Sequence, residues 1–369
     1  MLHRLTLANF RNYAALDAEF APRLTIVSGA NGQGKTNLLE ACYLAATGRS
    51  HRGSRDREMI RFGESDAVLR AEIEFDNREI THELRLSNTG RRVNIRNGSK
   101  LRRADAFAET LSAVMFTPDD LNLVRGGADE RRRLLDRCIS QLRPRYAEAL
   151  AEHTRLYAHK TRVLRGWREN SGLLDALPEF NNALIDADAR LIFYRASFVR
   201  KLAERARVLH ADCSHGTEEL ALTYKTVRGA DTENPDRAVI AHALRERSRE
   251  LYDAELASGQ CLVGARRDDI EIAINGTEAR KYASQGQART AALAVKLAER
   301  EIMADELGRA PLLLLDDVLS ELDEARREFV LTRSSGGQVV ISTCVLGETP
   351  PNTRIIEIQN GGIARCIIT

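Results

Sequence analysis

The stretch from Gly29 to Thr36, Gly-Ala-Asn-Gly-Gln-Gly-Lys-Thr, constrains the fold more than any other part of the chain. It matches the phosphate-binding pattern G-x-x-x-x-G-K-[ST] at every fixed position, between a predicted buried strand (24–27) and a predicted helix (37–44). Glycines let backbone N–H groups face phosphate oxygens, and the helix N-terminus adds a positive field. The motif, called the P-loop below, therefore predicts an α/β fold with a nucleoside triphosphate site.

Individual side chains of the P-loop have distinct predicted roles. We expect Lys35 to reach the β- and γ-phosphates, which makes it a candidate catalytic residue, and the Thr36 hydroxyl to ligate Mg²⁺. The predicted ligand is thus ATP with Mg²⁺. The remaining residues of the loop are candidate phosphate-binding positions: Gly29, Ala30, Asn31, Gly32, Gln33 and Gly34.

A second buried strand is predicted at 311–315, and it ends in the two carboxylates Asp316 and Asp317. Ligands of open α/β sheets bind at the carboxyl edge of the strands, where these carboxylates would lie. We expect Asp316 to ligate Mg²⁺ and Asp317 to orient or deprotonate the attacking water. The alternative is a pair of solvated aspartates that cap a following helix.

A third motif, Ser284-Gln285-Gly286-Gln287, precedes a predicted long helix that runs to Ala304. By itself it is compatible with an ordinary helix cap. Its small residues, however, leave helix N–H groups open for an anion. Because the P-loop helix already serves one set of phosphates, Ser284, Gly286 and Gln287 are predicted to face the γ-phosphate of a second subunit. ATP would then hold a homodimer together.

Composition indicates an ordinary globular chain of 369 residues, with 43% hydrophobic and 29% charged residues and a net charge of +2. No apolar segment is long enough to span a membrane, and the N-terminus lacks a signal-peptide core. Six scattered cysteines favour reduced thiols over a disulfide framework or a zinc site. We therefore expect a cytoplasmic protein without a membrane partner.

The pattern of the chain predicts two domains. An antiparallel β meander is expected at 67–96, closed by the hairpin turn Asn97-Gly98. From residue 129 long helical patterns take over, as at 137–168 and 237–257, with Leu184, Leu191 and Leu202 on one stripe of a long helix. The predicted division is a discontinuous nucleotide-binding domain, residues 1–128 and 258–369, and an inserted, mainly helical domain, residues 129–257.

These motifs resemble the RecF family of SMC-like, ABC-type ATPases, and the resemblance covers nearly the whole chain. It rests on five stretches: residues 9–13, 29–36, 47–52, 283–287 and 314–323. The resemblance implies an ABC-type P-loop ATPase head, with a mixed sheet and an antiparallel β meander, plus an inserted helical arm. It also implies Arg11 and Asn12 as further nucleotide contacts.

The resemblance further implies a weak, DNA-dependent ATPase that dimerises on ATP and acts in repair, replication and recombination. Its implied partners are double-stranded and gapped DNA, together with RecR, RecO and RecA. The distribution of charge does not by itself identify the DNA-binding surface of the protein, because arginine clusters are more often solvated or paired. The candidate phosphate contacts are Arg49, Arg52, Arg55, Arg102, Arg103 and Arg131 to Arg133.

Two features depart from expectation for such ATPases. The segment 264–269 reads Gly-Ala-Arg-Arg-Asp-Asp where the family usually reads Gly-Pro-His-Arg-Asp-Asp, and Thr343 stands near the position of the switch histidine in transporter ATPases. Two other functions remain open. A chromosome-organising or repair head of the SMC type would need a long coiled-coil arm, for which about 130 residues are too few. A transporter subunit would be expected to carry the switch histidine.

Overall fold

The computed structural model describes residues 1–90, 92–333, 336–346 and 349–369. The chain divides into two compact units, residues 1–121 with 296–369, and residues 122–295. Residues 258–295, expected in the nucleotide-binding domain, make most of their contacts within the second unit. The predicted domain boundaries stay a prediction, and the two units are described separately below.

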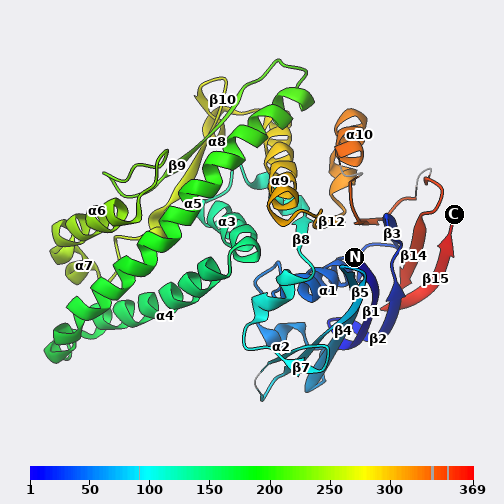
Figure 1. Cartoon of the computed structure of the whole chain (residues 1–369), viewed down its shortest axis with the longest axis horizontal. Helices are drawn as coiled ribbons and strands as arrows, with labels where there is room; N and C mark the ends of the chain where they lie inside the picture. Colours follow the sequence, from blue (N-terminus) through cyan, green and yellow to red (C-terminus); the bar gives the residue numbers. More distant parts are fainter. Residues whose placement is uncertain (91, 334–335, 347–348) are drawn as a thin grey trace. The chain divides into compact units, whose positions relative to one another are not determined.

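The first unit contains two sheets. One is an antiparallel meander in the order β2-β1-β4-β5-β6-β7, and the other is a mixed sheet in the order β15-β14-β3-β13-β12-β8 (Figure 1). The strands of the meander are β1 (Leu2–Phe10), β2 (Tyr13–Glu19), β4 (Asp66–Phe75), β5 (Arg78–Ser87), β6 (Val93–Arg96) and β7 (Ser99–Lys100). The predicted meander is confirmed; Arg91, which the sequence placed at the start of β6, lies outside the described residues.

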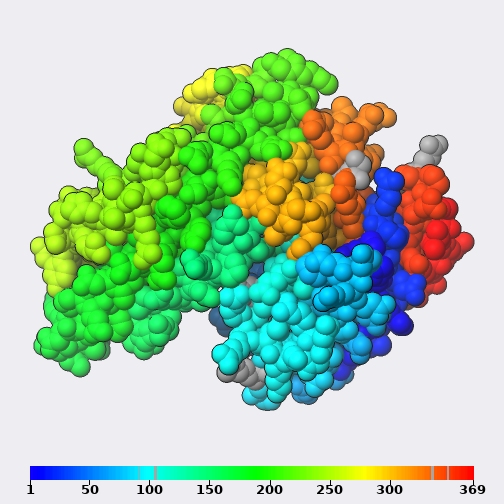
Figure 2. Space-filling view, viewed as in Figure 1, coloured from blue at the N-terminus to red at the C-terminus, as the bar shows by residue number. Residues whose placement is uncertain are grey.

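The mixed sheet brings both ends of the chain together. Its strands are β3 (Leu24–Ser28), β8 (Ala113–Phe116), β12 (Leu312–Asp316), β13 (Val339–Thr343), β14 (Arg354–Gln359) and β15 (Gly362–Ile368). Only β15 runs antiparallel to its neighbour. In the space-filling view the blue N-terminal strands and the red C-terminal hairpin accordingly lie side by side (Figure 2).

Helix α1 (Lys35–Thr47) fills the space between these two sheets. Leu38, Leu39 and Leu44 are fully buried and join one core cluster with residues of both sheets. This burial on every side explains why the helix shows almost no amphipathic pattern. The other helical segments of the unit are α2 (Asp56–Met59), η1 (Ala104–Glu109), η2 (Pro118–Asn122), η5 (Val318–Glu321) and α10 (Glu324–Arg333).

The second unit, called the arm below, is mainly helical. Its long helix α5 (Leu177–Cys213) packs against α4 (Pro144–Gly166), α6 (Arg237–Glu250) and β9 (Leu220–Lys225), and β9 pairs with β10 (Asp269–Ile274) (Figure 1). The predicted leucine stripe lies on the buried side of α5. The remaining elements are α3 (Ala128–Leu142), η3 (Ser171–Ala176), α7 (Tyr252–Ser258), η4 (Ala265–Arg267), β11 (Thr277–Glu278) and α8 (Ala279–Tyr282).

Two predicted helices are each divided in the structure. The helical pattern at 137–168 breaks at Arg143, because Pro144 begins α4 and cannot continue the preceding helix. The pattern at 237–257 breaks at Leu251, between α6 and α7. Helix α9 (Gln285–Leu307) begins directly after Ser284, as predicted, and its residues belong to both units.

Candidate nucleotide-binding site

The P-loop joins β3 to α1 and needs its glycines for two physical reasons. Gly29, Gly32 and Gly34 have φ values of 150°, 79° and 120°, which favour glycine. A Cβ on Gly34 would also lie 2.5 Å from the Asn12 amide, and one on Gly29 would lie 2.5 Å from the backbone oxygen of Ile358. The loop is therefore shaped by close packing on β14 and on the β1–β2 turn.

Asn12 braces the P-loop from outside. Its Nδ2 donates to the Gln33 carbonyl at 2.9 Å, and its Oδ1 accepts from Asn37 Nδ2 at 2.8 Å. The neighbouring Tyr13 hydroxyl donates to the Gly34 carbonyl at 2.8 Å. The structure thus gives Asn12 a supporting role, and a direct contact with the nucleotide stays a prediction.

The Arg11 guanidinium, also predicted to contact the nucleotide, is held by protein partners. It donates to both carboxylate oxygens of Glu40, at 2.9 and 2.8 Å, and to Ser54 Oγ at 2.7 Å. Burial opposes ionisation of Glu40, but hydrogen bonds from Arg11 and Ser50 outweigh burial, and the pKa of this carboxyl is lowered. Arg11 therefore anchors α1 in this structure, and its predicted nucleotide contact would require it to leave this ion pair.

Lys35 is buried and points into the P-loop. Its Nζ donates to the carbonyls of Gly29, at 2.8 Å, and Ala30, at 3.1 Å. A third contact, at 3.1 Å, joins Nζ to the sulfur of Cys344. Because an ammonium group has three N–H donors, these contacts account for all of them.

Asp316 meets the P-loop at the carboxyl edge of the mixed sheet. Its Oδ1 accepts from Thr36 Oγ1 at 3.0 Å and from Ser342 Oγ at 2.7 Å. These residues meet because β12 and β3 both run parallel to β13, with Asp316 level with Ser342. Burial raises the pKa of Asp316 and outweighs the hydrogen bonds that lower it. A cation at this carboxylate would offset the burial.

The donor set suits Mg²⁺, which binds one or two protein oxygens and keeps phosphate and water ligands. Thr36 Oγ1 and Asp316 Oδ1 are hard oxygen donors in mutual contact. Among the described residues no group of three or more His, Cys, Asp and Glu side chains could enclose a metal. Mg²⁺ would therefore be held by these two residues together with ligand oxygens.

Asp317 adopts a left-handed backbone conformation, with φ of 52°, which is uncommon for a residue other than glycine and recurs at functional sites. Its backbone N–H donates to Ser342 Oγ at 2.9 Å, which fixes the turn after β12. Ser342 Oγ therefore connects the Asp316 carboxylate to the backbone N–H of Asp317. The sequence motifs assigned no role to Ser342.

Ser284 caps α9 in a reciprocal arrangement. Its Oγ accepts from the Gln287 N–H at 3.1 Å, and its own N–H donates to Gln287 Oε1 at 2.8 Å. The side chain is exposed, and among the residues that the structure describes its O–H donates to no acceptor. The helix-cap alternative is thus observed, and a hydroxyl donor remains at the helix end. Contact of Ser284, Gly286 and Gln287 with a nucleotide stays a prediction.

The divergent segment 264–269 has a structural role in the arm. Asp268 is buried, lies 3.2 Å from Arg195 Nη1 and accepts hydrogen bonds from Tyr224 and Thr226. Asp269 pairs with Arg131, with 2.6 Å between Nε and Oδ1. Arg131 is buried in this pair, so the sequence-based assignment of Arg131 to phosphate contact does not fit this structure.

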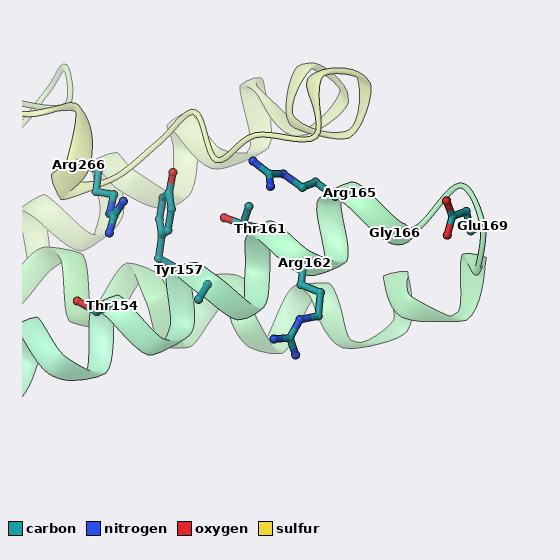
Figure 3. A pocket seen from close by; sticks show the side chains of 9 residues that line it. Thr154, Tyr157, Thr161, Arg162, Arg165, Gly166, Glu169 and Arg266 are labelled. Atoms are coloured by element: carbon teal, nitrogen blue, oxygen red, sulfur yellow. The ribbon is translucent and has the colours of Figure 1, made fainter. Parts of the chain in front are cut away.

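Arg266, from the same segment, borders a surface hollow of about 710 Å³ in the arm (Figure 3). Its guanidinium lies 4.1 Å from the ring centre of Tyr157, which projects from α4. Arg162 and Arg165 of α4 also line the hollow. No residue of the P-loop or of β12 takes part, so this hollow is separate from the nucleotide site.

Comparisons with known proteins agree with this geometry. The family model described as the RecF/RecN/SMC N terminal domain matches residues 1–348. A protein of Symbiobacterium thermophilum named DNA replication and repair protein RecF is 37% identical, over 98% of this chain and 97% of its own length. A protein of the same name from Agathobacter rectalis is 36% identical, over 95% and 94%.

Solved structures give the same result. A structure of the recombination mediator protein RecF-ATPrS in the RecFOR pathway has a TM-score of 0.92 and 32% identity, covering 98% of this chain and 97% of that chain. A RecF-ATP structure has a TM-score of 0.90 at the same identity. An Smc head domain from Pyrococcus furiosus, at 16% identity and a TM-score of 0.56, shares the fold alone.

The fold and the meeting of P-loop and carboxylate strand define an ABC-type P-loop ATPase head of the SMC class. Within that class the chain belongs to the RecF family of DNA replication and repair proteins. The predicted fold class and family resemblance are thereby confirmed. In the described part of the chain no helix is both long and apolar enough to cross a membrane.

Proposed function

We propose that this chain is an ATP-dependent recombination mediator that dimerises on ATP and binds duplex DNA near single-strand gaps. The observation that carries the proposal is the 3.0 Å hydrogen bond between Thr36 and Asp316. It places the two parts of an ATPase centre, 280 residues apart in the chain, at one point. The RecF-ATPrS and RecF-ATP relatives support ATP as the ligand.

The residues around the Thr36–Asp316 hydrogen bond have different roles in ATP hydrolysis. Lys35 and the P-loop backbone bind the phosphates, and Thr36 with Asp316 holds Mg²⁺. Bound Mg²⁺ neutralises charge on the phosphate oxygens. Asp317 orients the attacking water, because its turn is fixed by the backbone hydrogen bond to Ser342. Hydrolysis is slow, since no histidine stands at the switch position beside Thr343.

Dimerisation follows from the second exposed helix end. The Ser284 hydroxyl and the positive N-terminal end of α9 form a second anion-binding site, separate from the P-loop and α1. We assign this end to the γ-phosphate bound by a second copy of the chain. ATP then contributes to an interface that ADP, which lacks that phosphate, cannot complete.

The proposed DNA contact uses exposed arginines that follow α1. Arg49, Arg52 and Arg55 are exposed, and the Arg52 side chain is 40% accessible although it lies 3.5 Å from Glu40. Contacts of this kind bind phosphates without reading bases, so DNA binding is independent of sequence and sensitive to salt. Membership of the family extends the proposal to cooperation with RecO and RecR in loading RecA, in the cytoplasm.

A chromosome-organising head of the SMC type is the less favoured alternative. The longest helix described in the arm, α5, has 37 residues and spans about 55 Å. Its buried face packs against α4, α6 and β9 within one compact unit and does not form a free two-stranded coiled coil. The arm therefore suits a compact clamp.

The decisive experiment measures the ATPase rate and the oligomeric state of the full chain, with and without a gapped duplex at low salt. The proposal expects a monomer with ADP, a dimer with ATP, and a hydrolysis rate that the duplex raises. An oligomeric state that is the same with ADP and with ATP, and a hydrolysis rate that the duplex does not change, would contradict the proposal. A blunt duplex and a single strand, tested in parallel, show whether the gap itself is recognised.

A further inference from the structure

Cys344 connects the two parts of the proposed ATPase centre. It directly follows β13, the strand that pairs with β3 on one side and β12 on the other. Its Sγ lies 2.8 Å from Asn31 Oδ1, 3.1 Å from Lys35 Nζ and 3.6 Å from Asp317 Oδ2. One thiol therefore contacts the P-loop, its lysine and the second carboxylate.

Thr343, the residue that the sequence places nearest the switch position, makes other contacts. Its hydroxyl donates to the Val345 carbonyl at 2.9 Å, and the Thr343 hydroxyl oxygen accepts from the Val345 N–H at 3.2 Å. These contacts are local to the turn after β13. The side chain that reaches the lysine and the carboxylate is Cys344.

We propose that Cys344 is a positioning residue of this centre, an inference that rests on the proposed ATPase function. The single S–H of the thiol can be donated to Asn31 Oδ1 or to Asp317 Oδ2, and the sulfur accepts the one Lys35 N–H that the P-loop carbonyls leave. Sulfur is a weak acceptor, whereas a phosphate oxygen forms a strong, charge-assisted bond with an ammonium group. ATP therefore displaces the thiol from Lys35, while the S–H donated to Asp317 keeps the carboxylate in place.

The reactivity of the thiol tests this displacement directly. Cys344 and Cys366 are both exposed, and Cys42, Cys138 and Cys261 are buried. N-ethylmaleimide should modify both exposed thiols, and Cys366, which lies on β15, serves as a control within the same molecule. ATP at ten times its dissociation constant leaves about a tenth of the protein unbound. In the bound form the triphosphate at Lys35 covers the adjacent thiol, so modification of Cys344 should slow about tenfold, and that of Cys366 should not change.

Peptide mass spectrometry after timed modification gives both rates. ATP binding is measured separately, by titration with a fluorescent ATP analogue. If ATP binds and the Cys344 rate stays the same, the inference is wrong although the proposed function stands. If ATP does not bind, the proposed function itself fails. The Lys35→Ala variant, which should bind ATP poorly, should show no ATP protection of Cys344.

Kinetics of two variants test the positioning role. Cys344→Ser keeps a donor and acceptor, so kcat should stay within about twofold of the parent chain. Cys344→Ala removes the contact to Asp317, and loss of one hydrogen bond lowers kcat about fivefold. Its dissociation constant for ATP should be unchanged or lower, because nothing competes for Lys35. An alanine variant with the parent kcat, or a serine variant as slow as alanine, would overturn the assignment.

Discussion

The Thr36 hydroxyl donates a hydrogen bond to Asp316 across the carboxyl edge of the mixed sheet, with 3.0 Å between the oxygens. The bond requires β3, β13 and β12 to be neighbours in that order and to run in the same direction. The strand order therefore brings a helix start and a strand end together as one cation site. Ser342, from the strand between them, holds the carboxylate at 2.7 Å.

Asp316→Asn should separate metal-assisted nucleotide binding from binding to the P-loop alone. The amide keeps the shape of the side chain but removes the negative charge that attracts Mg²⁺. We expect ATP affinity in Mg²⁺ to fall at least about tenfold and affinity in EDTA to stay within about twofold. Titration with a fluorescent ATP analogue in both buffers measures this. Equal losses in both buffers would show that the substitution disturbs the loop instead.

Ser284→Arg should abolish dimerisation on ATP and leave ATP binding by the same chain intact. A long cation at the start of α9 blocks approach of the partner copy. The substitution also removes a helix cap, which costs about 1 kcal/mol. A loss of dimerisation could therefore arise from the cap alone, and a second variant is needed.

Ser284→Asp provides that control, because aspartate caps helices as well as serine does. It keeps the cap but places a negative charge where the proposal puts a γ-phosphate. Light scattering with ATP should find monomers for both variants, and circular dichroism should find the parent helix content for Ser284→Asp. If Ser284→Asp forms dimers at the same ATP concentration as the parent chain, Ser284 does not contact the γ-phosphate at the dimer interface.

The sequence predicted the P-loop, the two carboxylates and their strands because each is a local pattern. It did not predict Ser342 or Cys344 as part of the site, since their roles depend on the strand order β3-β13-β12, which local patterns do not contain. Arg11 shows the same limit. Its partner Glu40 is 29 residues away and buried, so the family resemblance suggested a nucleotide contact where the structure has an ion pair.

The break between α3 and α4 was, by contrast, available from the sequence. Pro144 occupies the first helical position of α4, where its missing N–H costs nothing. The periodic pattern continued through it because both helices bury apolar residues and both pack against α5. Periodicity alone therefore overestimated the length of the helix, and the proline correctly marked the start of a second helix.

His82 should make the first unit sensitive to acid. Its ring is buried against α1, with Nδ1 2.8 Å from the Ala45 carbonyl, and stacks on Phe107. Burial, which disfavours the charged ring, lowers the pKa of His82 to about 4. The unfolded chain takes up the proton near pH 6.5 and the folded chain does not. The resulting stability is complete above pH 6.5 and is lost as pH falls toward 4.

A shift of this size corresponds to about 3 kcal/mol between pH 6.5 and 4. Urea unfolding at several pH values measures it, with His82→Gln compared with the parent chain. The glutamine variant should be less stable at pH 7 but should lose less stability in acid. The exposed His242 on α6 provides the control, because His242→Gln should keep the parent pH dependence. Parallel pH profiles for parent and His82→Gln would contradict the prediction.

Replacement of Arg52 and Arg55 by alanine should weaken duplex binding at every sequence tested. Both side chains are exposed in the segment after α1. If each contacts one phosphate, the slope of log affinity against log salt should become shallower by about two. Fluorescence anisotropy with labelled duplexes between low and moderate salt measures the slope.

Arg249→Ala on α6 is the control variant, because the Arg249 side chain is 75% exposed and lies outside the proposed DNA contact. It should leave the salt slope and the affinity unchanged. An unchanged slope in the double variant would place the DNA on another face of the protein.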